Sequence, residues 1–213
     1  MTRYAGRRAV VVGQGTGIGL AIAKRLVEGG AKVLLTAGTA RDREHASAEL
    51  GSAARVVAPD AAVSAVSAVS AVENGGGIDL VFADAVPTAR PLLPHLEDGG
   101  AVVLTAAAPA PACVRALAAE LVSRGIRVNA VDPGCIEAPA GSAALLPPMG
   151  RLGSAEEVAR AALFLATDAT FTTGARLPVD GGLGHPRPHT TARPLPAKNP
   201  GRTPSPDDPE ITA

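Results

Sequence analysis

The chain alternates short apolar runs with helix-like stretches, and this alternation limits the fold more than any other feature of the sequence. The runs are rich in β-branched residues and span residues 9–12, 33–35, 55–58, 80–82, 102–104, 127–131 and 176–179. The helix-like stretches span residues 20–28, 40–50, 61–73, 112–123 and 155–166. Apolar strands joined by helices form a parallel sheet that helices cover on both faces. We therefore predict an α/β fold with a Rossmann-like doubly wound parallel sheet and three α/β/α layers.

Two local signals refine this prediction. Ser154 precedes the last helical stretch, and Glu157 lies three residues after Ser154, which is the spacing of a capping box. In contrast, the segment 87–98 is short and contains Pro91 and Pro94, and proline interrupts helices. We therefore expect a well-defined helix start after Ser154, and no full helix between the fourth and fifth strands.

The composition changes abruptly near residue 184, and the rest of the chain is polar and poor in apolar residues. Its prolines are Pro186, Pro188, Pro194, Pro196, Pro200, Pro204, Pro206 and Pro209. A segment with so little apolar surface to bury cannot compensate for the entropy that it loses on ordering. We predict one ordered domain over residues 1–184 and a Pro-rich disordered tail over residues 185–213.

Charge, hydropathy and cysteine content exclude several classes of function. Twenty basic residues balance twenty acidic ones, so no overall field attracts nucleic acid or an anionic membrane. The apolar run at residues 9–12 is too short for a signal peptide or a membrane span, which predicts a cytoplasmic protein. Cys113 and Cys135 are too few for a disulfide framework and lack the Cys/His spacing of a zinc site. We expect a small molecule as the ligand, and neither a metal, nucleic acid nor a membrane.

A glycine-rich turn joins the first predicted strand to the first predicted helix. Residues 13–19 read Gly-Gln-Gly-Thr-Gly-Ile-Gly, which fits the spacing G-x-x-x-G-x-G. Glycines at such a turn let the backbone approach a pyrophosphate closely, and the N-terminus of the next helix favours the negative charge. The alternative interpretation is a glycine-rich turn that binds no ligand.

This turn resembles that of the short-chain dehydrogenase/reductase family, and the resemblance covers most of residues 7–183. Asp60 matches the family's aspartate that meets the adenine, and residues 124–134 look like its strand and Pro-Gly turn beside the nicotinamide. Further matching segments are residues 150–166, 173–174 and 179–182. The resemblance implies an oxidoreductase-like protein in which residues 1–184 form a Rossmann-like NAD(P)-binding domain.

The resemblance also implies a set of cofactor contacts, all at or just beyond strand ends. They are Gly13, Gly15, Thr16, Gly17, Ile18, Gly19, Gly38, Thr39, Arg41, Asp60, Ala61, Ala83, Ala85, Thr105, Pro133, Gly134 and Ile136. An acid at the end of the second strand would bond the ribose 2′-hydroxyl of NAD, and none occurs before Asp42. This favours NADP. However, Thr16 and Thr39 stand where NADP-dependent relatives often have a basic residue, and Arg41 is equally compatible with an ordinary exposed place at a helix start.

The residues that the family's reductases use for catalysis are missing. In the family a tyrosine protonates the carbonyl oxygen, a lysine lowers the pKa of that tyrosine, a serine orients the substrate, and an asparagine holds a relay water. Here Tyr4 is the one tyrosine, and no lysine occurs between Lys32 and Lys198. The segment 105–111 has no serine and leads directly into a helix, so the Tyr-x-x-x-Lys stretch is deleted. We expect a degenerate catalytic centre.

Substitute catalytic groups are few. The candidates on loops at strand ends, or just beyond them, are Asp84, Thr105, Cys113 and Glu137, together with Asp132 and Cys135. For each of them an ordinary capping, turn or packing role is favoured, because no spacing demands a partner group. Nicotinamide positioning also departs from the family pattern, since Ala83–Val86 replaces its Asn-Asn-Ala-Gly turn and Ala138 replaces a threonine.

Three hypotheses for the function remain. The first, narrowly favoured, is a redox-inactive or weakly active relative that binds NAD(P) or another small molecule. The second is an enzyme with non-standard chemistry, such as substrate-assisted reduction, isomerisation or cyclisation. The third is a structural oligomer subunit with an empty site. In the family, two long helices form one subunit interface, and the last helix and last strand form another. Only the second pair looks complete in this sequence. We therefore predict a homodimer through residues 155–166 and 176–179, or a heteromer with an active homologue.

Overall fold

The computed structural model describes residues 3–13, 15–72, 76–105, 110–137 and 146–184. The strands are β1 Arg8–Val11, β2 Lys32–Thr36, β3 Ala54–Val57, β4 Ile78–Ala83, β5 Leu96–Leu104, β6 Arg127–Pro133 and β7 Arg176–Val179. The α-helices are α1 Gly17–Glu28, α2 Ala40–Leu50, α3 Ala62–Val72, α4 Val86–Ala89, α5 Pro111–Leu121 and α6 Ala155–Thr167. Short 3-10 turns are η1 Gly51–Ala53, η2 Pro59–Ala61, η3 Arg90–His95 and η4 Val122–Arg124. The Pro-rich segment 185–213 lies outside the described residues, so its predicted disorder stays a prediction.

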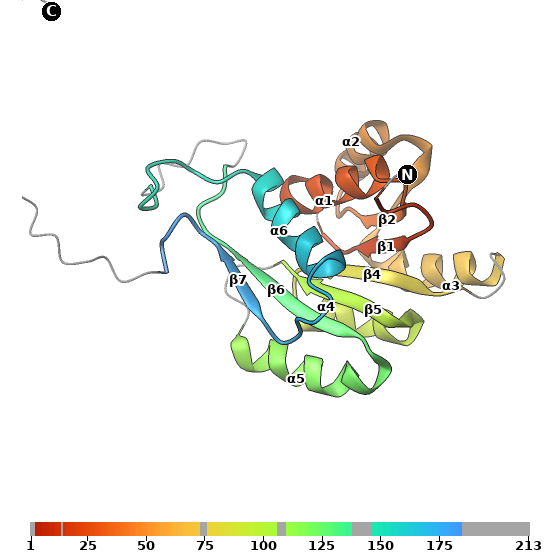
Figure 1. Cartoon of the computed structure of the whole chain (residues 1–213). Coiled ribbons are helices and arrows are strands. Elements are labelled where there is room, and N and C mark those ends of the chain that lie inside the picture. The colour runs from red at the N-terminus through yellow and green to blue at the C-terminus, as the bar shows by residue number, and fades with distance from the viewer. Residues whose placement is uncertain (1–2, 14, 73–75, 106–109, 138–145, 185–213) are drawn as a thin grey trace, which may run out of the picture.

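The described strands form one parallel sheet in the order β3-β2-β1-β4-β5-β6-β7. The chain builds outward from β1 to β3, then crosses to β4 and builds outward in the other direction. Helices α1, α2 and α6 cover one face of the sheet, while α3 and α5 cover the other (Figure 1). The predicted doubly wound α/β fold with three layers is confirmed.

Successive side chains of the central strands pack into two different cores, because they point to opposite faces of a sheet. Val11 packs on the α1 and α6 side, whereas Val10 packs on the α3 and α5 side. Phe82 and Val81 on β4 divide between the two cores in the same way. Each such apolar side chain that is fully buried stabilises the fold by about 1.5–3 kcal/mol, before the entropy of ordering is counted.

Both local signals in the sequence are confirmed. The backbone N–H of Glu157 donates to Oγ of Ser154 at 3.2 Å, and the backbone N–H of Ser154 donates to Oε2 of Glu157 at 2.9 Å, which is a complete capping box at the start of α6. Between β4 and β5 there is only the single turn α4 followed by η3, which contains Pro91 and Pro94. A full helix is therefore absent from this connection.

Strand β5 begins earlier than its apolar run predicts. The run covers residues 102–104, but β5 starts at Leu96 and pairs with β4 across an irregularity at which the register shifts between Ile78 and Leu80. The irregularity accommodates the polar, glycine-rich residues 97–100, and Gly99 within it has a φ of 78°. In the part of the chain that the structure covers, no helix has the length and apolar character to cross a membrane.

Candidate functional site

The carboxyl ends of parallel strands meet at one edge of the sheet, here called the carboxyl edge. Ligands of open α/β sheets bind at this edge, at the point where the strand order reverses. That point lies between β1 and β4, and the glycine turn of residues 13–19 follows β1 directly. The topology therefore brings the predicted turn to the expected place for a nucleotide.

The glycine turn is held closely against the end of β2. The buried Oγ1 of Thr36 accepts the backbone N–H of Gly13 at 2.9 Å and donates to the carbonyl of Gly13 at 3.0 Å. Gly15 has a φ of 73°, and a Cβ there would lie 2.5 Å from Cβ of Ala37. Only glycine fits this position. No sequence pattern indicates the role of Thr36, because this role depends on the pairing of β1 with β2.

The start of α1 is open. Gly17 has a φ of 55°, and a Cβ there would meet no atom within 4 Å. Thr16 occupies the N-cap position without a side-chain hydrogen bond to the helix. The backbone N–H groups of the first helical turn have no partner within the helix, so an unobstructed N-terminus is suited to an anion such as a pyrophosphate. Ile18 packs against the apolar core, and Gly19 lies close to Val11.

The loop between β2 and α2 carries the residues that would face the adenosine ribose. Thr39 caps α2, since its Oγ1 accepts the backbone N–H of Asp42 at 3.0 Å and donates to the Asp42 carboxylate at 2.6 Å. Nη1 of Arg43 donates to the carbonyls of Ala37 and Gly38, both at 3.2 Å. The guanidinium of Arg43 is thus anchored at the end of β2, whereas Arg41 is exposed.

Sequence reasoning pointed to Arg41 and missed Arg43. The signal that could have found it is the N-cap at Thr39, because a residue four positions into a helix lies above its cap, and the backbone N–H of Arg43 indeed donates to the carbonyl of Thr39 at 3.1 Å. Asp60 and Ala61 lie in η2, which begins one residue beyond the end of β3, and Asp60 is exposed. Both predicted residues therefore lie at the carboxyl edge.

The ends of β4 and β5 place Asp84 and Thr105 in structural hydrogen bonds. Asp84 accepts from the hydroxyl of Thr88, and the backbone N–H of Ala85 donates to the same hydroxyl oxygen at 3.1 Å. Thr105 donates to the carbonyl of Ala83 through its backbone N–H at 2.8 Å and through its hydroxyl at 3.3 Å. These contacts hold the start of α4 against the end of β4 and join the end of β5 to that of β4.

The segment after β6 is fixed to both β7 and the start of α6. The backbone N–H of Gly134, next to Pro133, donates to the carbonyl of Val179 at 3.0 Å, and a Cβ on Gly134 would lie 2.5 Å from Cα of Asp180. Ile136 forms a parallel bridge with Gly153, in which the backbone N–H of Glu137 donates to the Gly153 carbonyl at 2.9 Å. The Pro-Gly turn is therefore tied by backbone contacts to the elements on both sides of it.

The remaining candidates do not gather into a catalytic group. Cys113 is exposed on the first turn of α5, Glu137 is exposed beyond β6, and Asp132 is paired with Arg176. Cys135 is half-buried on the same loop as Glu137. Among the described residues no hydrogen bond joins any two of Asp84, Thr105, Cys113 and Glu137, and no three His, Cys, Asp or Glu residues are placed to hold a metal ion.

Tyr4 lies far from this site. Its backbone N–H donates to the carbonyl of Gly29 at 2.7 Å, and its ring is buried against Gly29, where an added Cβ would lie 2.1 Å from a ring carbon. Gly29 follows the last residue of α1, so Tyr4 lies at the edge of the sheet where the strands begin, here called the amino edge. Lys32 is the first residue of β2 and lies at this same edge. Lys24 forms an ion pair with Glu49, and its hydrogen bond lowers the pKa of Glu49.

The fold and the site define a Rossmann-like α/β protein with a glycine-rich turn at its topological switch point. Residues 7–91 match the family model of the short chain dehydrogenases, and residues 97–184 match that of the enoyl-(acyl carrier protein) reductases. The galactitol 2-dehydrogenase (L-tagatose-forming) of Cereibacter sphaeroides is 33% identical in an alignment that covers 84% of this chain and 96% of that protein. The chain belongs to the short-chain dehydrogenase/reductase family, as its resemblance implied.

Two further comparisons agree with this assignment. A 3-oxoacyl-[acyl-carrier-protein] reductase of Salmonella typhimurium is 32% identical, with 84% of this chain and 98% of that protein aligned. The solved structure of a short-chain dehydrogenase/reductase from Serratia marcescens BCRC 10948 superimposes with a TM-score of 0.73 over 85% of this chain and 99% of that chain. Its sequence identity is 24%, so it supports the fold.

Proposed function

We propose that this chain is an NAD(P)-binding member of the short-chain dehydrogenase/reductase family with a degenerate catalytic centre, redox-inactive or only weakly active. The observation that carries the proposal is the position of Tyr4. The one tyrosine of the chain is buried against Gly29 at the amino edge, whereas hydride transfer in this fold takes place at the carboxyl edge. A substrate carbonyl at the carboxyl edge therefore has no tyrosine within reach as a proton donor.

The nucleotide half of the proposal rests on the glycine turn. Gly15 fits only as glycine, Thr36 fixes the turn to β2, and the N-terminus of α1 is unobstructed at Gly17. A dinucleotide pyrophosphate suits these features, because it needs close backbone approach and a positive helix end. The turn would hold the cofactor, which supplies a hydride in active members of the family.

Two observations support a deletion in this chain, and the first of them concerns the catalytic region. Helix α5 begins at Pro111, only seven residues after β5 ends at Leu104. The alignment with the galactitol 2-dehydrogenase spans 244 positions although this chain has 213 residues, of which 84% take part, so gaps fall on this chain. A shortened connection before α5 is where the Tyr-x-x-x-Lys stretch of the family would be lost.

Within this proposal, NADP is the favoured cofactor. No acid precedes Asp42 in the loop after β2, and the Asp42 carboxylate already accepts a hydrogen bond from Thr39. Arg43 is anchored at the strand end on the carbonyls of Ala37 and Gly38. A fixed guanidinium suits a ribose 2′-phosphate, which accepts charge-assisted hydrogen bonds.

We further propose that the protein works as a homodimer or in a heteromer with an active homologue. Helix α6 and strand β7 lie side by side at one end of the sheet (Figure 1). Phe164 on α6 is 50% exposed, and Phe171 between these elements is fully exposed. Exposed aromatic side chains are typical of the centres of protein interfaces.

Titration of the purified full chain with NADPH and NADH tests the proposal, together with assays on small ketones. Saturable binding of NADPH with little or no ketone reduction is the expected result. Binding of neither nucleotide would favour a structural subunit with an empty site. Activity confined to one acidic or phenolic substrate would instead favour substrate-assisted chemistry.

A further inference from the structure

A cavity of about 420 Å³ opens at the amino edge of the sheet, on the opposite side of the molecule from the glycine turn. Its lining comes from the N-terminal segment, the first residues of β4 and β6, the irregular part of β5 and the end of α6. The two edges are separated by the length of strands such as β4, about 20 Å for six residues. The cavity is therefore independent of the nucleotide site.

Bare backbone forms part of the cavity wall. Gly99 on β5 and Gly125 before β6 both line it, with φ values of 78° and 68°. A Cβ on Gly125 would lie 3.6 Å from the backbone of Gly99, so the two glycines are close neighbours. A Cβ on Gly99 would meet no atom within 4 Å. Small residues at these positions leave the space unfilled.

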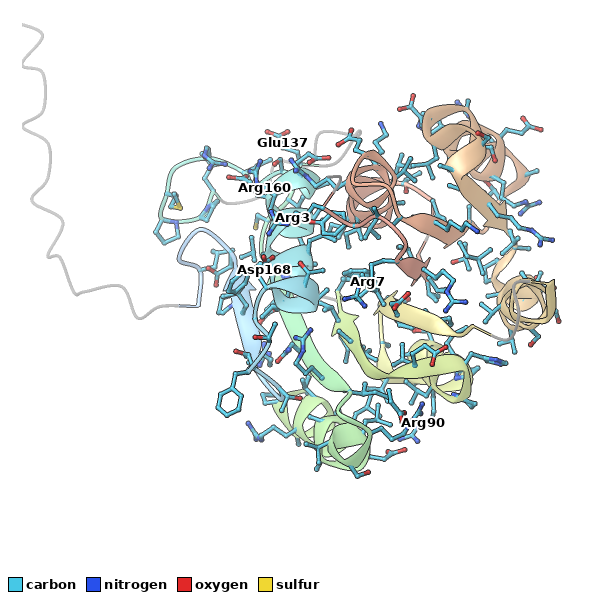
Figure 2. All side chains as sticks on the ribbon, turned by 45° about the vertical axis from the view of Figure 1, so that its right-hand side comes forward. Arg3, Arg7, Arg90, Glu137, Arg160 and Asp168 are labelled. Atoms are coloured by element: carbon cyan, nitrogen blue, oxygen red, sulfur yellow. The ribbon has the colours of Figure 1, made fainter. Side chains whose placement is uncertain are left out.

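Two of the three arginines in the lining have carboxylate partners. Nη2 of Arg3 donates to both oxygens of Asp168, at 2.7 and 2.6 Å, and Nη1 of Arg7 donates to Asp79 at 3.1 Å. The hydrogen bond to Asp168 raises the pKa of Arg3, and that from Arg3 lowers the pKa of Asp168. Figure 2 shows Arg3 and Asp168 beside α6, with Arg7 at the start of β1.

The third arginine is held differently. Arg127 donates through its Nη groups to the carbonyls of Leu165, Ala166 and Ala169 at the end of α6, at 2.6, 2.5 and 3.0 Å. These carbonyls carry partial negative charge but no full counter-charge. In the described part of the chain no carboxylate pairs with Arg127, and burial lowers its pKa. The lining thus holds three cationic and two anionic side chains.

We propose that this cavity binds a small organic anion through a phosphate or carboxylate group, with Arg3, Arg7 and Arg127 as the recognising residues. One negative charge would balance the lining, and a volume of this size suits a small metabolite. Arginine is the side chain best matched to such groups, because its planar N–H groups form charge-assisted hydrogen bonds with two oxygens at once. The bonds to Asp168 and Asp79 use one nitrogen of Arg3 and of Arg7, which leaves further N–H groups for a ligand.

The test is a titration of the isotope-labelled full chain with inorganic phosphate and, separately, with acetate, followed by amide chemical shifts. Sodium chloride at equal ionic strength is the reference. We expect saturable shifts at Gly99, Gly125 and Thr170 with phosphate, acetate or both. In Arg3→Gln and Arg7→Gln the affinity should fall about tenfold, equivalent to about 1.4 kcal/mol. Arg160→Gln, on the exposed face of α6, is the matched control and should bind as the unaltered chain does.

Several outcomes would overturn the proposal. One is the absence of saturation at about 50 mM, far above the ~1 mM dissociation constant of a weak site. Another is equal binding by the Arg3 and Arg7 variants, provided that their melting shows them to be folded. Shifts confined to residues 13–19 would mean that the anion occupies the nucleotide site alone. Saturation by phosphate only would support the site and restrict its ligand to phosphate groups.

Discussion

Gly15 and Gly17 both have positive φ values, but their surroundings give them different roles. Gly15 is buried and lies against Ala37, so it shapes the turn itself. Gly17 is exposed and faces open space above the first turn of α1. The space next to Gly17 is where a pyrophosphate would approach the helix N–H groups. Side chains at the two positions should therefore affect folding and binding differently.

Replacement of Gly17 by valine should abolish nucleotide binding. The branched side chain would fill the space needed by the pyrophosphate, and a β-branched residue at positive φ costs about 1–2 kcal/mol of stability. Calorimetry with NADPH and NADH measures the first effect and thermal melting the second. Gly51→Val is the control, because Gly51 after α2 also has a positive φ, of 63°, and no neighbour within 4 Å of an added Cβ. Equal binding by folded Gly17→Val would contradict the assigned phosphate position.

Arg43 should determine the choice between the two nucleotides. Arg43→Gln removes a cation held at the end of β2 and should weaken NADPH binding about tenfold or more, since a hydrogen bond to a charged group contributes about 1.5–3 kcal/mol. NADH affinity should change little. Arg41→Gln is the matched control, because it removes the exposed arginine that lies two residues before Arg43. An unchanged ratio of NADPH to NADH affinity in Arg43→Gln would show that this arginine does not contact the 2′-phosphate.

The sequence revealed part of this site. Glycine spacing alone located the turn at residues 13–19, because only glycine satisfies positive φ and close approach cheaply. The roles of Thr36 and Arg43 could not be predicted, since both depend on distances that exist only after β1 and β2 pair. For the same reason sequence could place Asp84 and Thr105 at strand ends but could not name Thr88 and Ala83 as their partners.

At the scale of elements, helix bounds followed closely from the sequence when a cap was present. The stretch 40–50 coincides with α2, and α6 starts directly after Ser154 as its capping box predicts. The start of strand β5 was harder to predict from the sequence, because its first half contains the polar segment 97–100 and pairs irregularly with β4. Apolar periodicity carries no information about a strand whose exposed half contains two glycines.

The cap of α6 makes a testable contribution to stability. Ser154→Ala should lower the free energy of unfolding by about 1 kcal/mol, because the side-chain bond to the backbone of Glu157 is lost. Chemical denaturation at neutral pH measures this loss. Thr170→Ala, in the turn after α6, is the comparison and should cost less, as no side-chain hydrogen bond is assigned to it in the described chain. Equal losses would show that the cap adds nothing specific.

Glu157 should also make the stability depend on pH. The hydrogen bond from Arg151, and those from Ser154, lower the pKa of Glu157 from 4.5 to about 2. A carboxylate whose pKa is depressed on folding stabilises the fold above its unfolded pKa, and this contribution disappears as the pH falls from about 4.5 toward 2. Melting curves of Glu157→Gln should therefore change less across that window than those of the unaltered chain. Parallel curves for the two proteins would contradict the assignment.

At the scale of the whole molecule, the α6 and β7 end carries the proposed dimer interface. Phe164→Asp would place a charge in its centre and should convert a dimer into a monomer in light scattering. Val122→Asp is the control, because Val122 is a similarly exposed apolar residue on η4, after α5. A monomeric unaltered chain, or a dimer that Phe164→Asp leaves intact, would exclude this interface.

The two edges of the sheet separate the glycine turn from the one tyrosine. The carboxyl edge holds the glycine turn and the Pro-Gly turn, which suit a nucleotide. The amino edge holds the buried Tyr4. A general acid must lie within hydrogen-bond reach of the group that it protonates, whereas the two edges are separated by the length of strands such as β4, about 20 Å.

Reduction of simple ketones by NADPH tests this central claim most directly. The full chain and the galactitol 2-dehydrogenase of Cereibacter sphaeroides would be assayed side by side with NADPH and with NADH, with loss of reduced-nucleotide absorbance as the signal and with nucleotide binding checked independently. General acid catalysis contributes about 10²–10⁴-fold in rate, so we predict turnover lower by at least that factor, or none. Turnover of several ketones at a rate comparable with that relative, and unchanged when Asp84, Cys113, Cys135 and Glu137 are replaced in turn, would contradict the degenerate centre.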